Sequence, residues 1–365
     1  MIKVGSDFSG VGAFDQALSR LGIKHETIFA CDMDKYARQT YIENYGEPSY
    51  YPTDVYERKI PQDALDLYMT SPPCQAFSQA GSRLGKEDKR GILFFNSHEF
   101  IQKNKPRFFI FENVRGLLSH DNGKTFQEWL NFLGGKSING LPVLFADENA
   151  VPYHIYYKVI NSKNLNVPQN RERVFIVGIK DDKDNVFQFP KDEHLTKKLK
   201  DVLEKEVDEK YFLTKKMIKY FTDNQKGRGS GRATNFLTGD ESHTNCLLAS
   251  YYKQSKDGIY LKVKSANKKG YEEATEGDSI NLSVPNSKTR RGRVGKKVAQ
   301  TLDTQCNQAT LKQKKIRRLT PKECFRLMDF NDNFIFTCSD TQAYKQAGNS
   351  IVVKCLEKII EKLKL

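Results

Sequence analysis

A cysteine that follows two prolines is the first residue of this chain whose type and position suggest chemistry. In SPPCQAFSQAG, residues 71–81, an apolar run ends and Cys74 stands directly after Pro72 and Pro73. Proline cannot donate to a strand ladder and has a fixed φ, so Cys74 is expected on a stiff corner just past a strand. Small and polar residues follow, as in a loop that approaches a ligand. Taken alone, Cys74 is either a nucleophile at the carboxyl edge of a sheet or a buried thiol beside a turn.

Two further stretches place charged side chains where apolar runs begin or end. FENVRG, residues 111–116, puts Glu112 at the end of such a run, where a charge is costly without a task or a partner. QNRER, residues 169–173, puts Arg171 and Arg173 just before another run. A salt-bridged strand end and a solvated charge cluster are the ordinary alternatives. A thiol, a carboxylate and an arginine together at strand carboxyl ends of one sheet favour a catalytic site.

A glycine-containing turn and two acidic residues suggest a nucleotide-like ligand. DFSGVGAF places Gly10 and Gly12 between a strand and a helix, where the backbone can touch a ligand and helix N–H groups attract an anion. Asp32, in ACDMD, ends the next expected strand, and a carboxylate there can accept hydrogen bonds from ribose hydroxyls. Asp54, in PTDVY, ends a third run and could contact an adenine. The pattern lacks one glycine of the dinucleotide fingerprint, and a tight turn beside a surface aspartate explains it nearly as well.

Apolar runs alternate with amphipathic segments over residues 1–180. The expected strands are residues 3–8, 26–32, 67–71, 107–114, 156–162 and 173–180. Residues 12–22 show helical spacing, and Gly22 is a plausible stop. This alternation predicts an α/β fold with a mostly parallel sheet, helices on both faces, and ligands outside the carboxyl ends of the strands.

The end of the chain also shows regular helical patterns. Thr320 as N-cap, Pro321 at the first helical position and Glu323 two residues later predict a capping-box start. A final amphipathic helix is expected to open with Asn349 and Ser350 as caps and to pack on the first sheet.

Positive charge is concentrated in one part of the chain. The 365 residues carry a net charge of +14, and residues 191–320 hold 29 Lys and Arg against 16 Asp and Glu. Periodicity weakens between residues 185 and 315, where NQKGRGSGR and SKTRRGRVGKK suggest basic loops. Such a charge distribution suits a polyanion, in particular nucleic acid. A lysine-rich solvated surface is the alternative.

Several classes of protein are disfavoured by composition. No apolar run approaches the roughly 20 residues that cross a bilayer, so no membrane association is expected. The N-terminus lacks secretory features, which favours an intracellular, cytoplasmic location. The seven cysteines show no CxxC pair and no zinc spacing, so reduced thiols and no metal site are expected.

Five stretches together resemble the ordered motifs of the cytosine-5 DNA methyltransferases. In chain order they are DFSGVGAF, PPCQAFSQAG, FENV, QNRER and QAGNSIV. The resemblance covers about the first 180 and the last 50 residues and leaves the basic segment unmatched. It implies the Rossmann-like α/β fold of S-adenosylmethionine-dependent methyltransferases, with a smaller, irregular target-recognition domain. The implied division is a catalytic and cofactor-binding domain at 1–184, a recognition domain at 185–330, and a return to the catalytic domain at 331–365.

The resemblance also implies a reaction and its participants. The methyl donor is S-adenosylmethionine, and the substrate is a cytosine flipped out of double-stranded DNA, in a restriction–modification system. A monomer without an obligate protein partner is expected. Within the basic segment, TRRGRVGKK and LDTQCNQATL are candidates for DNA contacts.

Individual roles follow by matching motif positions. The Cys74 thiolate adds to carbon 6 of the ring, because cysteine combines sufficient thiolate with strong nucleophilicity. Glu112 contacts N3 and the exocyclic amine, and Arg173 contacts O2. Gln75, Asn113 and Arg171 surround the substrate, Arg171 in a supporting structural role. The implied cofactor contacts are Phe8, Gly10, Gly12, Asp32, Met33, Asp54, Val55, Pro73, Leu93, Asn349 and Ser350. Met33 replaces an aromatic residue often found in the family, which weakens stacking on adenine.

Three alternatives remain open. An RNA cytosine-5 methyltransferase would use the same catalytic fold, but the long, glycine-rich basic insertion argues against it. A DNA-binding regulator that has lost catalysis is opposed by the presence of Cys74, Glu112 and Arg173 together. A dinucleotide-dependent oxidoreductase leaves PPCQ and FENV unexplained.

Overall fold

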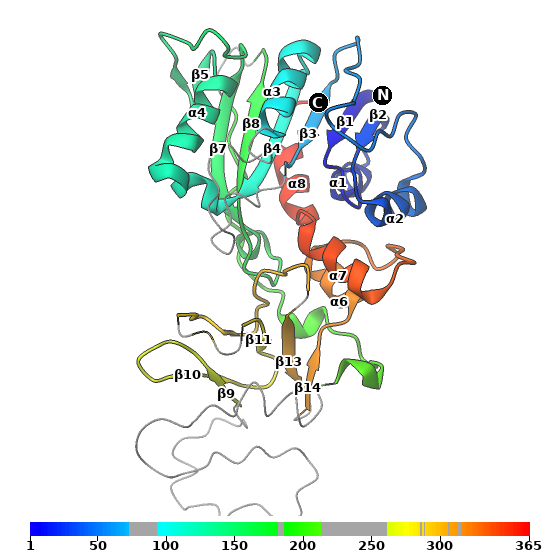
Figure 1. The fold of residues 1–365 in the computed structure, drawn as a ribbon, viewed down its shortest axis with the longest axis vertical. Helices are drawn as coiled ribbons and strands as arrows, with labels where there is room; N and C mark the ends of the chain where they lie inside the picture. The colour runs from blue at the N-terminus through cyan, green and yellow to red at the C-terminus, as the bar shows by residue number, and fades with distance from the viewer. Residues whose placement is uncertain are drawn as a thin grey trace, which may run out of the picture.

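A mixed eight-stranded sheet forms the upper part of the molecule (Figure 1). The computed structural model describes residues 1–72, 93–181, 186–212, 261–284, 287, 289–305, 307–312 and 315–365. The strand order is β2-β1-β3-β4-β8-β7-β5-β6. The bounds are β1 Ile2–Asp7, β2 His25–Cys31, β3 Leu67–Thr70, β4 Phe108–Val114, β5 Ser137–Ile138, β6 Leu141–Pro142, β7 His154–Asn161 and β8 Glu172–Ile179. All six strands expected from the apolar runs are present.

The sheet is mostly parallel, as expected, but β8 and β6 run in the opposite direction. β2, β1, β3 and β4 run parallel to one another, but β8 is antiparallel to both β4 and β7. A parallel neighbour needs a crossover of a dozen or more residues, and the link from Asn161 to Glu172 is shorter than that. The beginning of β8 therefore lies at the carboxyl end of β4. An arginine at the carboxyl end of a strand was expected, but Arg173 stands near the beginning of β8. It nevertheless lies at the same edge of the sheet as the carboxyl end of β4.

Helices cover both faces of this sheet, as predicted. On one face, α1 (Ala13–Arg20) and α8 (Val353–Ile360) pack with Ile110 and Val177; on the other, α3 (Leu93–Asn104) and α4 (Lys124–Leu133) pack with Phe111 and Ile176. The remaining helical elements near the sheet are α2 (Lys35–Tyr45), the 3₁₀ segments η1 (Arg115–Gly123) and η2 (Ser162–Leu165), and, further along, η3 (Leu199–Asp201) and η4 (Glu209–Tyr211). Among the described residues, no helix is both long and apolar enough to span a membrane.

The chain returns to the first sheet through three helices. α6 (Pro321–Leu327) begins with the predicted capping box of Thr320 and Glu323. α7 covers Asp340–Asn349, and α8 packs against α1, as expected for the final helix. The predicted caps of that helix are wrong. Asn349 and Ser350 end α7, where the Ser350 N–H bonds to Gln346, and Val352 precedes α8.

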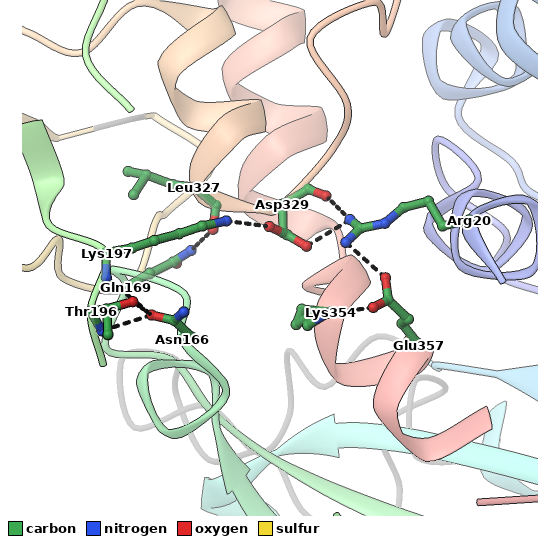
Figure 2. Close-up of polar contacts among 9 residues, drawn as sticks. All are labelled: Arg20, Asn166, Gln169, Thr196, Lys197, Leu327, Asp329, Lys354 and Glu357. Atoms are coloured by element: carbon green, nitrogen blue, oxygen red, sulfur yellow. Dashed lines mark hydrogen bonds and ion pairs between the residues drawn. The ribbon is translucent and has the colours of Figure 1, made fainter. Parts of the chain in front are cut away.

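A polar cluster fastens this returning segment to the first helix (Figure 2). Arg20 of α1 pairs with Asp329 and with Glu357 of α8, each at 2.7 Å. Lys197, from the start of the basic segment, approaches the other oxygen of Asp329 at 3.8 Å. One half-buried guanidinium therefore links helices from the two ends of the chain.

The described part of the basic segment forms two small antiparallel sheets below the first (Figure 1). One contains β9 (Leu261–Lys264) and β10 (Tyr271–Ala274). The other has the order β12-β11-β13-β14, with β11 Ser279–Asn281, β12 Val294–Gly295, β13 Gln308–Lys312 and β14 Lys315–Arg318. Their core consists of only a few side chains, including Val263, Ile280 and Leu311.

A buried ion pair joins the four-stranded sheet β12-β11-β13-β14 to α6. Arg317 of β14 donates to both carboxylate oxygens of Glu323, at 2.7 and 2.8 Å, and both side chains are almost fully buried. The Thr320 and Glu204 N–H groups donate to the same carboxylate at 2.9 and 2.7 Å. Four donors thus satisfy Glu323, and each would be left buried without its anionic partner if the charge were removed.

We therefore predict that Glu323→Gln lowers the free energy of unfolding by about 3–5 kcal/mol, because it leaves a buried guanidinium without a countercharge. Urea denaturation followed by circular dichroism measures the loss. Glu99→Gln is the matched control, since Glu99 pairs with Lys103 in solvent, and about 0.5 kcal/mol or less is expected there. Equal losses in both variants would contradict the prediction.

Candidate active site

A carboxylate and a guanidinium meet at the edge where β4 ends and β8 begins. Arg173 lies opposite Val114 in the ladder, and Glu112 lies opposite Phe175. Side chains two residues apart share a face, so Arg173 reaches diagonally to Glu112. The Arg173 Nε and Glu112 Oε1 atoms are 3.1 Å apart, and both side chains are largely buried.

Burial changes the protonation of this carboxyl group. It raises the pKa of Glu112 above its usual range, while the charges of Arg173 and Arg171 oppose the shift. Removal from water disfavours the anion, and the nearby guanidinium groups favour it. Glu112 therefore holds its proton to higher pH than a free glutamate does.

The neighbouring residue of β4 contacts the segment that leads to the cysteine. The Asn113 side chain donates to the Pro72 carbonyl at 3.4 Å, just beyond the end of β3. Since β3 runs parallel to β4, Pro72 lies at the same carboxyl edge as Glu112. Pro73, Cys74 and Gln75 themselves lie outside the described residues.

Arg171 turns away from this pair and bonds to backbone instead. Its terminal nitrogens donate to the carbonyls of Leu302, Gly348 and Ser350 at 3.2, 3.0 and 2.8 Å. The side chain is buried. This arrangement fits the supporting structural role expected for it.

The turn after β1 offers an open backbone beside a fixed carboxylate. Gly10 and Gly12 both have positive φ, at 55° and 82°, which favours glycine. The Gly10 N–H donates to Asp32 Oδ2 and the Asp34 N–H to Asp32 Oδ1, both at 2.8 Å. A Cβ on Gly10 would meet no described atom within 4 Å. Each carboxylate oxygen of Asp32 keeps a further lone pair for an outside donor.

The other residues expected around the cofactor lie at the ends of several elements. Met33, next to Asp32, is 85% exposed. The Asp32 N–H donates to the Pro52 carbonyl, and this bond places the loop of residues 52–55 beside Asp32. In that loop Asp54 is exposed and Val55 is buried. No strand ends at Asp54, contrary to the expected third run. Leu93 begins α3, exposed Asn349 ends α7, and Ser350 is buried.

An ion pair beneath the turn was not predicted from the sequence. Asp7 Oδ1 lies 2.8 Å from Arg58 Nε, and the Tyr68 hydroxyl donates to Asp7 Oδ2 at 2.7 Å. The Arg58 guanidinium also stacks on Phe100 at 4.6 Å. Asp7 directly precedes Phe8, whose φ is 57°, so this buried pair supports a strained turn. A charged residue closing an apolar run was the only sequence signal.

Comparison with known proteins identifies the family. A family model described as C-5 cytosine-specific DNA methylase matches residues 2–365. The chain belongs to this family. It is accordingly a methyltransferase enzyme, as the ordered motifs implied.

Curated relatives match along almost the whole methylase. The type II methyltransferase M.DsaV of Dactylococcopsis salina is 33% identical, over 98% of this chain and 84% of the relative. M.HpaII of Haemophilus parainfluenzae is 32% identical, over 98% and 88%. The orphan methyltransferase M.SPRI of Bacillus phage SPR is 30% identical, over 99% and 97%.

Solved structures share the fold of the methylase. The Entamoeba histolytica methyltransferase EhMeth aligns with a TM-score of 0.62 at 17% identity, over 99% of this chain and 97% of that one. A putative DNA modification methyltransferase of an Escherichia coli prophage aligns with 0.60 at 18%, over 99% and 98%. The Rossmann-like methyltransferase fold is thereby confirmed.

We predict that Arg173→Gln raises the pKa of Glu112 further, because the guanidinium opposes the effect of burial. Carbon-13 carboxyl NMR, with the signal assigned by its loss in Glu112→Gln, should show a higher titration midpoint. Arg115→Gln is the control, since Arg115 pairs with the more exposed Glu172 and should leave the midpoint in place. A midpoint that stays or falls in Arg173→Gln would contradict the assignment.

Proposed function

We propose that this methylase transfers a methyl group from S-adenosylmethionine to carbon 5 of a cytosine within a specific double-stranded DNA sequence. The observation that carries the proposal is the buried Glu112–Arg173 pair, at the sheet edge that Pro72 also occupies. The relatives named as type II methyltransferases support a role as the modification enzyme of a restriction–modification system. Such a role places the protein with the DNA inside the cell, and a monomer suffices for it.

The residues at the carboxyl edge fit the proposed cofactor. Asp32 would accept hydrogen bonds from the ribose hydroxyls, and the open turn at Gly10 would lie against the methionine half. Exposed Met33 and the loop of Asp54 and Val55 would flank the adenine. When bound, S-adenosylmethionine supplies an electrophilic methyl group on a sulfonium. The hydroxyl of Ser71 contacts the Phe8 carbonyl at 3.5 Å, so this turn adjoins the segment that leads to Cys74.

The chemistry begins at the pyrimidine ring, because carbon 5 of cytosine is a poor nucleophile. The Cys74 thiolate forms a bond to carbon 6, and the electrons of the 5,6 double bond become available at carbon 5 as an enamine. Carbon 5 then forms a bond to the methyl group as the bond from that group to the sulfonium sulfur breaks, which leaves S-adenosylhomocysteine. A base or water takes the carbon 5 proton, and the released electron pair restores the 5,6 double bond and expels the Cys74 thiolate from carbon 6.

Glu112 and Arg173 stabilise the charge that develops on the ring. The raised pKa of Glu112 keeps a proton available for N3 as electrons move toward that atom. Arg173, held in place by its contact with the Glu112 carboxyl group, would donate to O2. Asn113 positions the Pro72 segment through its carbonyl contact.

A base within a duplex is unreachable, so the cytosine must leave the stack at a cost of a few kcal/mol. We assign the basic sheets the phosphate and base contacts that offset this cost. Within TRRGRVGKK, Arg293 is buried and donates to the Asn281 and Ser283 carbonyls, so it orders the loop. Exposed Arg291 is the better candidate for DNA.

The proposed division of the chain is a catalytic part at 1–184, a recognition part at 185–330 and a return at 331–365. Among the described residues, the two small sheets share a core that is separate from the cores of the large sheet, which supports a separate recognition unit. Phe325 and Leu327 of α6 pack in the core of the large sheet, which favours moving the start of the return from residue 331 to the start of α6 at Pro321.

We predict that Cys74→Ser abolishes methylation and leaves S-adenosylmethionine binding largely intact, because only the nucleophile is lost. Bisulfite sequencing of DNA from expressing cells should show one recurring methylated sequence for the wild type and none for the variant. Calorimetry measures cofactor binding. Cys338→Ser, whose thiol contacts Gln346, is the control and should methylate normally. Full turnover by Cys74→Ser would refute the nucleophile, and methylation of transfer RNA in place of duplex DNA would refute the substrate.

A duplex containing 5-fluorocytosine at the methylated position should trap the enzyme, because fluorine at carbon 5 blocks the final elimination. A denaturant-stable complex is expected in electrophoresis, only with S-adenosylmethionine present. The Cys74→Ser variant should give none. Absence of a complex from the wild type under turnover conditions would count against the covalent scheme.

A further inference from the structure

One buried guanidinium joins three segments that are distant in sequence. Arg171 is 3% exposed and stands just before β8, two residues from Arg173. It donates to the carbonyl of Leu302, which lies between β12 and β13, and to the carbonyls of Gly348 and Ser350, at the end of α7. All three acceptors are backbone carbonyls, so the contacts depend on where those segments lie and not on their side chains.

The two segments that Arg171 contacts also touch each other directly. A Cβ on Gly348 would lie 2.5 Å from the Asp303 carbonyl carbon and oxygen and 2.8 Å from the Thr304 nitrogen. The obstacle is backbone, which cannot rotate out of the way. Any side chain at residue 348 would therefore push residues 303–304 away from the end of α7.

Residues 299–302 are hydrogen-bonded to the segment before β8. The Asn170 N–H donates to the Ala299 carbonyl and the Ala299 N–H donates to the Pro168 carbonyl, at 2.8 Å each. The Leu302 N–H donates to the buried Gln169 side chain at 3.2 Å. Asp303 Oδ1 then accepts from the N–H groups of residues 305 and 307, which lead into β13. A displacement of the four-stranded sheet β12-β11-β13-β14 would therefore also displace residue 302.

We propose that Arg171 is a positioning residue that couples the cofactor loop, residues 348–350, to the recognition segment, residues 299–305. This inference rests on the proposed function, in which Asn349 and Ser350 adjoin the cofactor and the second sheet carries DNA contacts. Exposed Asn349 lies between the two carbonyls that Arg171 holds. A ligand that holds this loop in one position also holds the Gly348 and Ser350 carbonyls in place. Because Arg171 donates to both of them and to Leu302, the position of the Leu302 carbonyl is then restricted as well.

Coupling of this kind is reciprocal in the two binding equilibria. If a bound cofactor tightens DNA binding by some factor, bound DNA tightens cofactor binding by the same factor. Arg171 also lies close enough to Glu112 for its charge to act on that carboxyl group. The positional and the electrostatic effects can be separated, because Gly348→Ala displaces residues 303–304 and leaves the Arg171 side chain in place.

The test measures DNA affinity by fluorescence anisotropy with and without S-adenosylhomocysteine, on a duplex that carries the sequence found by bisulfite sequencing. In the wild type we expect about tenfold tighter DNA binding with the cofactor product present. Arg171→Lys, which removes the three-way donor geometry, should bring the ratio of the two DNA affinities close to one. Gly348→Ala, which leaves Arg171 intact, should also bring the factor close to one.

Arg326→Lys is the matched control, because Arg326 also donates to a backbone carbonyl on the recognition side, that of Val202 at 3.2 Å. The ratio of its DNA affinities with and without S-adenosylhomocysteine should equal that of the wild type. A wild-type factor of one, or an undiminished factor in Arg171→Lys or Gly348→Ala, overturns the coupling. A wild type that binds neither S-adenosylhomocysteine nor duplex DNA overturns the proposed function itself.

Discussion

The antiparallel pairing of β8 with β4 is the constraint on which the site depends. In a wholly parallel sheet, residues that precede a strand lie at the opposite edge from residues that end one. Here the short link after β7 forces β8 to run backwards, so its first residues arrive where β4 ends. Arg173 consequently lies beside Glu112, and Arg171 lies within reach of the end of α7.

The cost of burying charge shapes the rest of this edge. Glu112 is buried with a guanidinium that partly offsets the loss of water, and Asp7 is buried with Arg58. Removing either partner would leave a buried charge uncompensated, which is far more costly than the pair itself. Asp7 and Glu112 both stand at or near the carboxyl end of a strand, and burial raises the pKa of both. Glu112 differs from Asp7 in its neighbours, which are Arg173 of the antiparallel β8 and the Pro72 segment that Asn113 contacts.

Local patterns predicted the elements well, and long-range geometry explains what they missed. Apolar runs identified the strands, and the capping box identified the start of α6, because both depend on neighbouring residues. The direction of β8 was missed, since it follows from loop length and not from the apolar run. AGNS contains residues common at helix starts, yet it ends α7, because Ser350 bonds back to Gln346.

Arginines were the hardest residues to interpret from the sequence. Arg171 and Arg293 stand in charge-rich stretches typical of exposed or ligand-binding surface, yet both are buried with backbone carbonyls as acceptors. A guanidinium has five donors in a rigid fork, so one side chain can fasten several loops that lack regular hydrogen bonds. Loops meet most often where two parts of a chain join, and that is where Arg20, Arg171 and Arg317 lie. In a basic protein, excess positive charge therefore serves two purposes: part of it is available to a polyanion, and part of it holds in place the surfaces that would meet one.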